Sequence, residues 1–212
     1  MDPGDAILRD GRDLRAVVCE QCRRMHRVGR ASGTGGGISI RDGDRAYVAP
    51  SGVHKELIAP EDLFAIDLEG RVLERPIDPA LTTSACTSLF LHAYRLRDAG
   101  AVIHSHSIHA MLATAITTGS EFRISRLEMI KGIAGHGWSD ELVVPILENV
   151  AHERDLAPAL VDAIRAYPAT HAVLVRRHGL YVWGRDWRAA KAHAEVYDYV
   201  FQAAVELHKL SR

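Results

Sequence analysis

The order in which short strands and helices follow one another is the feature that most constrains the fold of this chain. Two strand pairs are predicted early, around an Asp-Gly turn in RDGDRAYVAPSG and around Glu69 and Gly70 in EDLFAIDLEGRVL. Helical patterns are interspersed among the later strands. This order predicts an α/β protein with a mixed, mainly antiparallel central sheet covered by helices, rather than a regular βαβ winding.

Start and stop signals give approximate bounds for the other elements. A first helix is expected to end near Gly29, and capping residues at Thr82 or Thr83 predict a second helix that closes at Gly100. The remaining predictions are a strand at AVIHSHS, a helix at IHAMLATAI, strands at LVVPIL and AVLVRRHGLYVWG, and helices at about residues 153–166 and 186–209.

Length and charge narrow the classes of function. The 212 residues are enough for one large α/β domain over 1–212. Lys and Arg total 26 against 27 for Asp and Glu, so no basic excess favours nucleic acid or an anionic membrane, and a small-molecule partner is expected. MDPGDAILRDGRDLR has no apolar core of signal-peptide type and no membrane-length apolar run occurs, which predicts a soluble cytoplasmic protein.

The three cysteines indicate a reducing compartment, because an odd number cannot pair fully. Cys19 and Cys22 form a C-x-x-C pair, a spacing found in redox sites and in half of a structural zinc site. No second such pair exists, and apolar residues recur around both cysteines at helical spacing. We therefore interpret Cys22 as a small core residue and Cys19 as its neighbour on the same helix.

The run AVIHSHSIHA contains the strongest metal-ligand pattern. Residues two apart on a strand point to the same face, so the side chains of His104 and His106 should converge, whereas His109 begins a new element. Two imidazoles suit Zn²⁺, and a catalytic zinc site has three protein ligands. His178, at the end of an apolar strand and before a glycine, is the best third candidate. Hydrogen-bonded core histidines remain the alternative.

A glycine-rich loop precedes the first predicted hairpin. GTGGGIS could present backbone N–H groups to a phosphate, and APSGVHKE adds a second glycine, a hydroxyl and Lys55. Neither the dinucleotide nor the Walker glycine pattern is present. The sequence leaves two alternatives open, an anion-binding loop and an ordinary flexible loop.

With TGGGIS, APSG, AVIHSHS, EMIKG and VLVRRHGLYVWG in this order, the chain resembles the class II aldolase fold family from about residue 13 to 208. Within that family it is most similar to the sugar-phosphate dehydratases of methionine salvage. The resemblance implies a three-layer α/β/α fold, a homotetramer with sites near subunit boundaries, and one catalytic Zn²⁺ per subunit. The implied ligands are His104, His106 and His178.

The resemblance also assigns the other site residues. Glu128 in LEMIKG takes the role of the acid/base glutamate, and the phosphate-contacting loops fall on Thr34, Gly36, Gly37, Ser51 and Gly52. The family's aldolases carry an asparagine near Gly37 that this chain lacks, which leaves Gly37 only its backbone N–H for such a contact. Lys131 could neutralise the phosphate or tune Glu128, or could be an ordinary solvated lysine.

Cys86 separates the two reactions that the family performs. The aldolases place a glutamate beside the metal at the start of the helix before the H-x-H strand, and Cys86 occupies that place here. This departure implies zinc-dependent dehydration of a 5-methylthio-substituted ketose 1-phosphate, with Cys86 either contacting substrate or filling space. The alternatives are an aldolase or epimerase of a related ketose phosphate and a non-catalytic binding module of the same fold.

Overall fold

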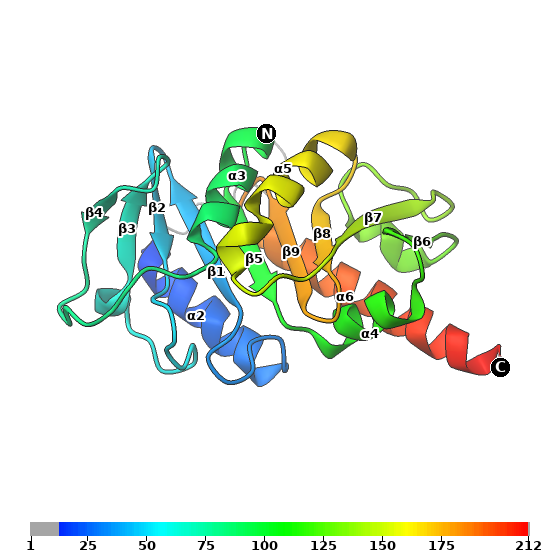
Figure 1. Cartoon of the computed structure of the whole chain (residues 1–212), viewed down its shortest axis with the longest axis horizontal. Helices are drawn as coiled ribbons and strands as arrows, with labels where there is room; N and C mark the ends of the chain where they lie inside the picture. The colour runs from blue at the N-terminus through cyan, green and yellow to red at the C-terminus, as the bar shows by residue number, and fades with distance from the viewer. Residues whose placement is uncertain (1–12, 212) are drawn as a thin grey trace.

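The computed structural model describes residues 13–211 and contains one sheet of nine strands in the order β4-β3-β2-β1-β5-β9-β8-β7-β6 (Figure 1). Neighbouring strands are antiparallel except for the parallel pair β7–β8. The strands are β1 (Gly37–Asp42), β2 (Arg45–Val48), β3 (Phe64–Asp67), β4 (Val72–Glu74), β5 (Ala101–Ser105), β6 (Glu121–Ile124), β7 (Leu142–Leu147), β8 (Ala172–Val175) and β9 (Gly179–Gly184). The prediction of a mixed, mainly antiparallel sheet is confirmed.

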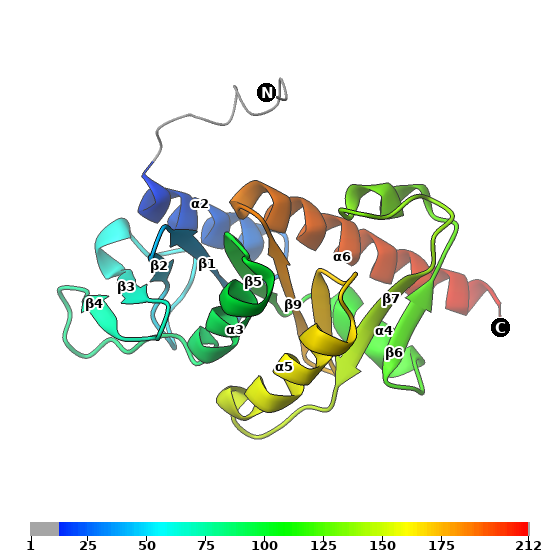
Figure 2. The same cartoon turned by 90° about the horizontal axis from the view of Figure 1, so that it is seen from above.

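Helices cover both faces of this sheet. The α-helices are α2 (Leu14–Arg27), α3 (Thr87–Arg97), α4 (Ile108–Ile116), α5 (Ala157–Ala166) and α6 (Trp187–Leu210), and the short 3₁₀ helices are η1 (Pro60–Asp62), η2 (Glu128–Gly132) and η3 (Glu153–Leu156). One apolar core joins α2, α4 and α6 to the sheet, and a second joins α3 and α5 to it. Figure 2 shows α2 and α6 along one face with α3 and α5 along the other, so the three-layer α/β/α arrangement is also confirmed.

Several local predictions are accurate. The two hairpins β1–β2 and β3–β4 form around the predicted turns, and Gly43 in the first turn has a φ of 59°. Helix α4 covers the predicted IHAMLATAI. Cys22 is fully buried on α2, which confirms its interpretation as a core residue, and its helical neighbour Cys19 is fully buried as well.

Two predictions about helices need correction, and one strand was not predicted. Helix α3 begins at Thr87, after Cys86, because Thr83 pairs instead with Pro50 in an isolated bridge. The helix expected over residues 153–166 is divided into η3 and α5, with a proline in the first turn of α5. Strand β6, an edge strand with a single buried residue, was missed because its alternation is too short to recognise.

Two further expectations concern the N-terminal stretch and membrane-spanning segments. The polar N-terminal stretch that argued against a signal peptide lies, up to residue 12, outside the described residues. Within residues 13–211, none of the helices combines the length and apolar character needed to cross a membrane.

Candidate active site

His104 and His106 lie at the carboxyl end of β5, in the middle of the sheet. In the antiparallel registers, His104 is opposite Gly37 of β1 and opposite Tyr181 of β9. His104 is almost completely buried, and its Nε2 atom is 2.9 Å from Nε2 of His106. The two side chains therefore converge as their spacing on the strand predicts.

His178 joins them through the tight connection between β8 and β9. Arg177 in this connection has a φ of 53°, and Gly179 lies so close to the backbone carbonyl of Ser105 that a Cβ atom would overlap with it. This close approach brings Nε2 of His178 to 3.1 Å from Nε2 of His106. The structure thus brings together all three predicted ligands, two from the end of β5 and one from the β8–β9 connection, 72 residues after His106.

The hydrogen bonds of two rings fix which nitrogens face the cluster. Nδ1 of His104 is 3.1 Å from the carbonyl oxygen of Leu180, and Nδ1 of His178 is 3.2 Å from Oδ1 of Asn149. Each Nδ1–H can donate to its oxygen partner, which leaves each Nε2 with a lone pair directed at the other rings. Converging lone pairs repel one another unless a cation lies among them, so this donor set fits a divalent metal ion.

A fourth group in the cluster is Glu153, which sequence reasoning missed. Its Oε1 atom is 2.7 Å from Nε2 of His104 and 3.7 Å from Nε2 of His178. The ligand atoms of all four residues lie within 4.8 Å of one another. Glu153 begins η3, 47 residues after His106, and no local pattern in HERD marks it as a ligand.

The surroundings of the cluster shift several pKa values. Burial, followed by the neighbouring His104 and His178, lowers the pKa of His106 to about 4, which keeps its ring neutral. Burial alone would raise the pKa of Glu153, but the close approach of His104 and hydrogen bonds with Tyr181 and Cys86 outweigh it and hold that pKa below its usual range. Burial raises the pKa of the Cys86 thiol to about 12, so Cys86 is protonated at neutral pH.

The glycine-rich loop lies directly beside the histidines. Gly35 leaves room for the ring of His106, because a Cβ atom at this position would overlap with Nδ1 and Cε1 of that ring. The buried ammonium of Lys55 donates to the carbonyl oxygens of Thr34 at 2.9 Å and Val53 at 3.1 Å, and so joins the two loops that were predicted to contact phosphate.

A cavity connects these loops to the cluster. It is lined by His104, His106, Glu153 and Lys55 together with predicted substrate-binding residues, namely Thr34, Gly36, Ser51, Gly52 and Cys86. Gly37 does not line it, but pairs with His104 in the sheet. A second hollow, lined by Asn149 and Arg177, also borders His106 and His178.

Glu128 and Lys131 lie elsewhere on the chain. They form an ion pair of 2.7 Å on η2, where the Glu128 side chain is 74% exposed, and neither residue lines the two hollows that border the histidines. The structure therefore does not bring the predicted acid/base residue to the histidines within one chain.

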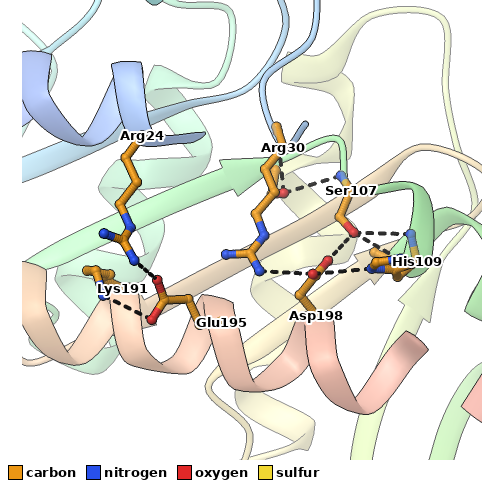
Figure 3. A network of polar contacts seen from close by, with 9 residues as sticks. Arg24, Arg30, Ser107, His109, Lys191, Glu195 and Asp198 are labelled. Atoms are coloured by element: carbon orange, nitrogen blue, oxygen red, sulfur yellow. Dashed lines mark hydrogen bonds and ion pairs between the residues drawn. The ribbon is translucent and has the colours of Figure 1, made fainter. Parts of the chain in front are cut away.

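A polar network supports the turn that follows His106 (Figure 3). Asp198 of α6 accepts hydrogen bonds from Arg30 at 2.9 Å and from the hydroxyl of Ser107, and its Oδ2 is 3.2 Å from Nδ1 of His109. Ser107 caps α4, and the carbonyl oxygen of Arg30 accepts the His106 N–H at 2.9 Å. This network links the segment before the glycine-rich loop to the start of α4 and to α6, and it gives His109 a partner outside the cluster.

Comparison with family models identifies a protein family for this chain. Residues 16–205 match the model described as "Class II Aldolase and Adducin N-terminal domain". The chain belongs to this family. The structure of an L-fuculose 1-phosphate aldolase has a fold similar to that of this chain, with a TM-score of 0.77 and 20% sequence identity. The match covers 93% of this chain and 87% of the aldolase chain.

Curated relatives are considerably more similar in sequence. The chain is 48% identical over 202 residues to a protein of Drosophila grimshawi named "Probable methylthioribulose-1-phosphate dehydratase", covering 92% of this chain and 88% of that protein. It is 49% identical over 214 residues to a probable bifunctional methylthioribulose-1-phosphate dehydratase/enolase-phosphatase of Vitis vinifera. That match covers 94% of this chain but only 40% of the grapevine protein.

Proposed function

We propose that this chain removes water from 5-methylthioribulose 1-phosphate to give 2,3-diketo-5-methylthiopentyl 1-phosphate, as a zinc-dependent step of methionine salvage in the cytoplasm. The observation that carries the proposal is the cluster of His104, His106 and His178 beside the cavity of the glycine-rich loop. The names of the relatives at 48–49% identity support the reaction.

The three histidines would hold the metal ion through their Nε2 atoms. A divalent ion bound there would supply Lewis-acid chemistry that polarises the C2 carbonyl group of the ketose. The backbone N–H groups near Thr34, Gly36, Gly37, Ser51 and Gly52 would bind the phosphate, with the Lys55 ammonium holding the two loops together. Cys86, which remains a thiol, would line the substrate cavity.

Glu128 would move the protons of the reaction. Its carboxylate would take the proton from C3, and the electron pair of that C–H bond would form a double bond between C3 and C4. The C4 hydroxyl group would leave as water, with a proton returned by the same glutamic acid. Ketonisation of the resulting enol gives the diketone. Lys131, paired with Glu128, would orient that carboxylate until substrate arrives.

This role of Glu128 requires a second subunit. Because Glu128 is exposed and lies outside both hollows around the histidines, a neighbouring chain would have to bring its Glu128 to them. A cyclic homotetramer, in which one surface of each chain meets a different surface of the next, would provide this arrangement four times.

The test is to incubate the purified protein with 5-methylthioribulose 1-phosphate and to follow the mass of the product. Dehydration gives a product lighter by one water molecule. Cleavage into two carbonyl compounds would instead indicate an aldolase, and an isomer of unchanged mass would indicate an epimerase. Either of these results, or no reaction, would contradict the proposal.

A further inference from the structure

Glu153 is the residue of the cluster that the proposed reaction does not use. Its Oε1 atom lies 2.7 Å from Nε2 of His104, while Nδ1 of the same ring is already 3.1 Å from the carbonyl oxygen of Leu180. When Nδ1–H donates to Leu180, Nε2 of neutral His104 carries a lone pair and not a proton. A carboxylate oxygen and a nitrogen lone pair then face each other at hydrogen-bond distance, with neither a proton nor a cation between them.

The rest of the cluster has the same deficiency. Nε2 of His106 is 2.9 Å from Nε2 of His104 and 3.1 Å from Nε2 of His178. An additional proton on Nε2 of His104 could satisfy Glu153, but a proton on Nε2 of His106 can be directed at only one of its two neighbouring rings, so protons alone leave one of these contacts unsatisfied. A cation among the four groups satisfies all of these contacts at once.

Glu153 is also held rigidly in this position. Its Oε1 atom accepts a hydrogen bond of 2.6 Å from the hydroxyl group of Tyr181, a fully buried residue whose ring stacks on that of His104 with centroids 4.2 Å apart. The thiol of Cys86 also hydrogen-bonds to Glu153. Among residues 13–211, no lysine or arginine lies within ion-pair distance of this carboxylate.

The separations match those of a coordination shell. Four ligands at zinc bond lengths of about 2.0–2.1 Å around a tetrahedron lie about 3.3 Å from one another. Four of the six separations among these ligand atoms, from 2.7 to 3.7 Å, lie around this value, and all six are within 4.8 Å.

We propose that Glu153 is a fourth protein ligand of the metal ion in the substrate-free enzyme, and that Tyr181 and Cys86 position its carboxylate. This inference rests on the proposed function, because it requires that the three histidines bind a metal ion. It adds a carboxylate from η3 to a site otherwise built on β5 and the β8–β9 connection.

The experiment measures metal binding without substrate. Zn²⁺ affinity is determined by competition with a chromophoric chelator, and the visible absorption of Co²⁺-loaded protein reports the ligands and their number. Glu153→Gln keeps an oxygen acceptor for Tyr181 but removes the charge. It should weaken Zn²⁺ binding by more than about 100-fold, beyond the range typical of outer-sphere residues, and change the Co²⁺ spectrum.

Two control variants separate ligation from positioning and from simple charge. Tyr181→Phe removes the supporting hydrogen bond and should weaken binding by about 10-fold with the Co²⁺ spectrum retained. Glu148→Gln removes an exposed carboxylate that pairs with Arg176, and should leave both affinity and spectrum unchanged. Circular dichroism checks folding, and if Glu153→Gln does not fold, Glu153→Asp takes its place with the same expected spectral change.

The outcomes distinguish this inference from the proposed function. If the wild-type protein binds one ion per chain through its histidines and Glu153→Gln has the same affinity and Co²⁺ spectrum, Glu153 is not a ligand but the histidine site stands. If the wild-type protein binds no metal ion, both proposals are wrong.

Discussion

The rings of His104 and Tyr181 stack across the β5–β9 strand pair, with their planes 10° apart and their centroids separated by 4.2 Å. The antiparallel register places the two residues directly opposite each other. The same Tyr181 donates a hydrogen bond to Glu153. One strand pairing therefore orients both a predicted ligand and the carboxylate beside it, and the expected effects of mutation follow from this arrangement.

Removal of two ligands should abolish metal binding. The wild-type protein should contain about one divalent ion per chain, and changing both His104 and His106 to alanine should remove it, since His178 with at most the Glu153 carboxylate beside it binds such ions only weakly. Elemental analysis after gel filtration measures the occupancy. Full occupancy in the double variant, or full activity of metal-free wild-type protein, would show that the assignment of these ligands is wrong.

Substitution of Glu128 should separate binding from chemistry. Glu128→Gln should retain the metal ion while turnover falls by about 10²- to 10⁴-fold, because the amide cannot accept the C3 proton. Glu128→Asp should be intermediate. Glu206 is a matched control, since it is also exposed and paired with a lysine three residues later, and Glu206→Gln should be fully active. Turnover of Glu128→Gln within a few-fold of wild type would exclude Glu128 as the base.

Mixed oligomers should reveal whether Glu128 acts across a subunit boundary. Glu128→Gln and His178→Ala chains are each expected to be inactive alone. When they are unfolded and refolded together in equal amounts, about a quarter of the sites in a cyclic tetramer should combine an intact histidine set with an intact Glu128 from the next chain. Activity assays of the mixture measure this recovery. No recovery, with tetramers present, would place both groups in the same chain.

The network around Asp198 should contribute to stability. Asp198→Asn replaces a largely buried carboxylate that pairs with Arg30 and Ser107, and should lower the free energy of unfolding by about 1–3 kcal/mol. Glu195, on the same helix between Arg24 and Lys191, is more exposed, so Glu195→Gln should cost less than about 1 kcal/mol (Figure 3). Urea denaturation measures both variants. Equal effects would contradict the importance of burial at Asp198.

Acid should destabilise the protein through histidines outside the site. Burial and the adjacent His193 lower the pKa of His171 from 6.5 to about 4, and burial also lowers the pKa of His193, whose Nε2 accepts the Ala134 N–H. The unfolded chain therefore binds more protons than the folded chain between about pH 6.5 and 4. The free energy of unfolding should be highest above this interval and fall as the pH falls through it.

This pH dependence can be measured by urea denaturation of metal-free protein at several pH values. The variant His193→Gln cannot be protonated at this position, so its stability should decrease less steeply with acid than that of the wild type. A slope that is equally steep in both proteins would show that His193 is not one of the groups responsible.

Much of this protein follows from its sequence because the relevant rules act between near neighbours. The i and i+2 geometry of a strand is enough to bring His104 and His106 together, and the helical spacing around Cys22 is enough to predict its burial. The turns between β1 and β2 and between β3 and β4 are likewise specified by the residues within them.

Only the tertiary structure decided which distant groups meet. Glu153 reaches the cluster because the β5–β9 pairing puts Tyr181 beside His104, and Gly35 and Gly179 matter because other parts of the chain pack too closely there for a side chain. Glu128 is exposed and outside the hollows that border the histidines, although the family resemblance implied a catalytic role. The physical reason is that local patterns restrict the backbone and the face of an element, whereas side-chain contacts between elements depend on strand register and packing throughout the domain.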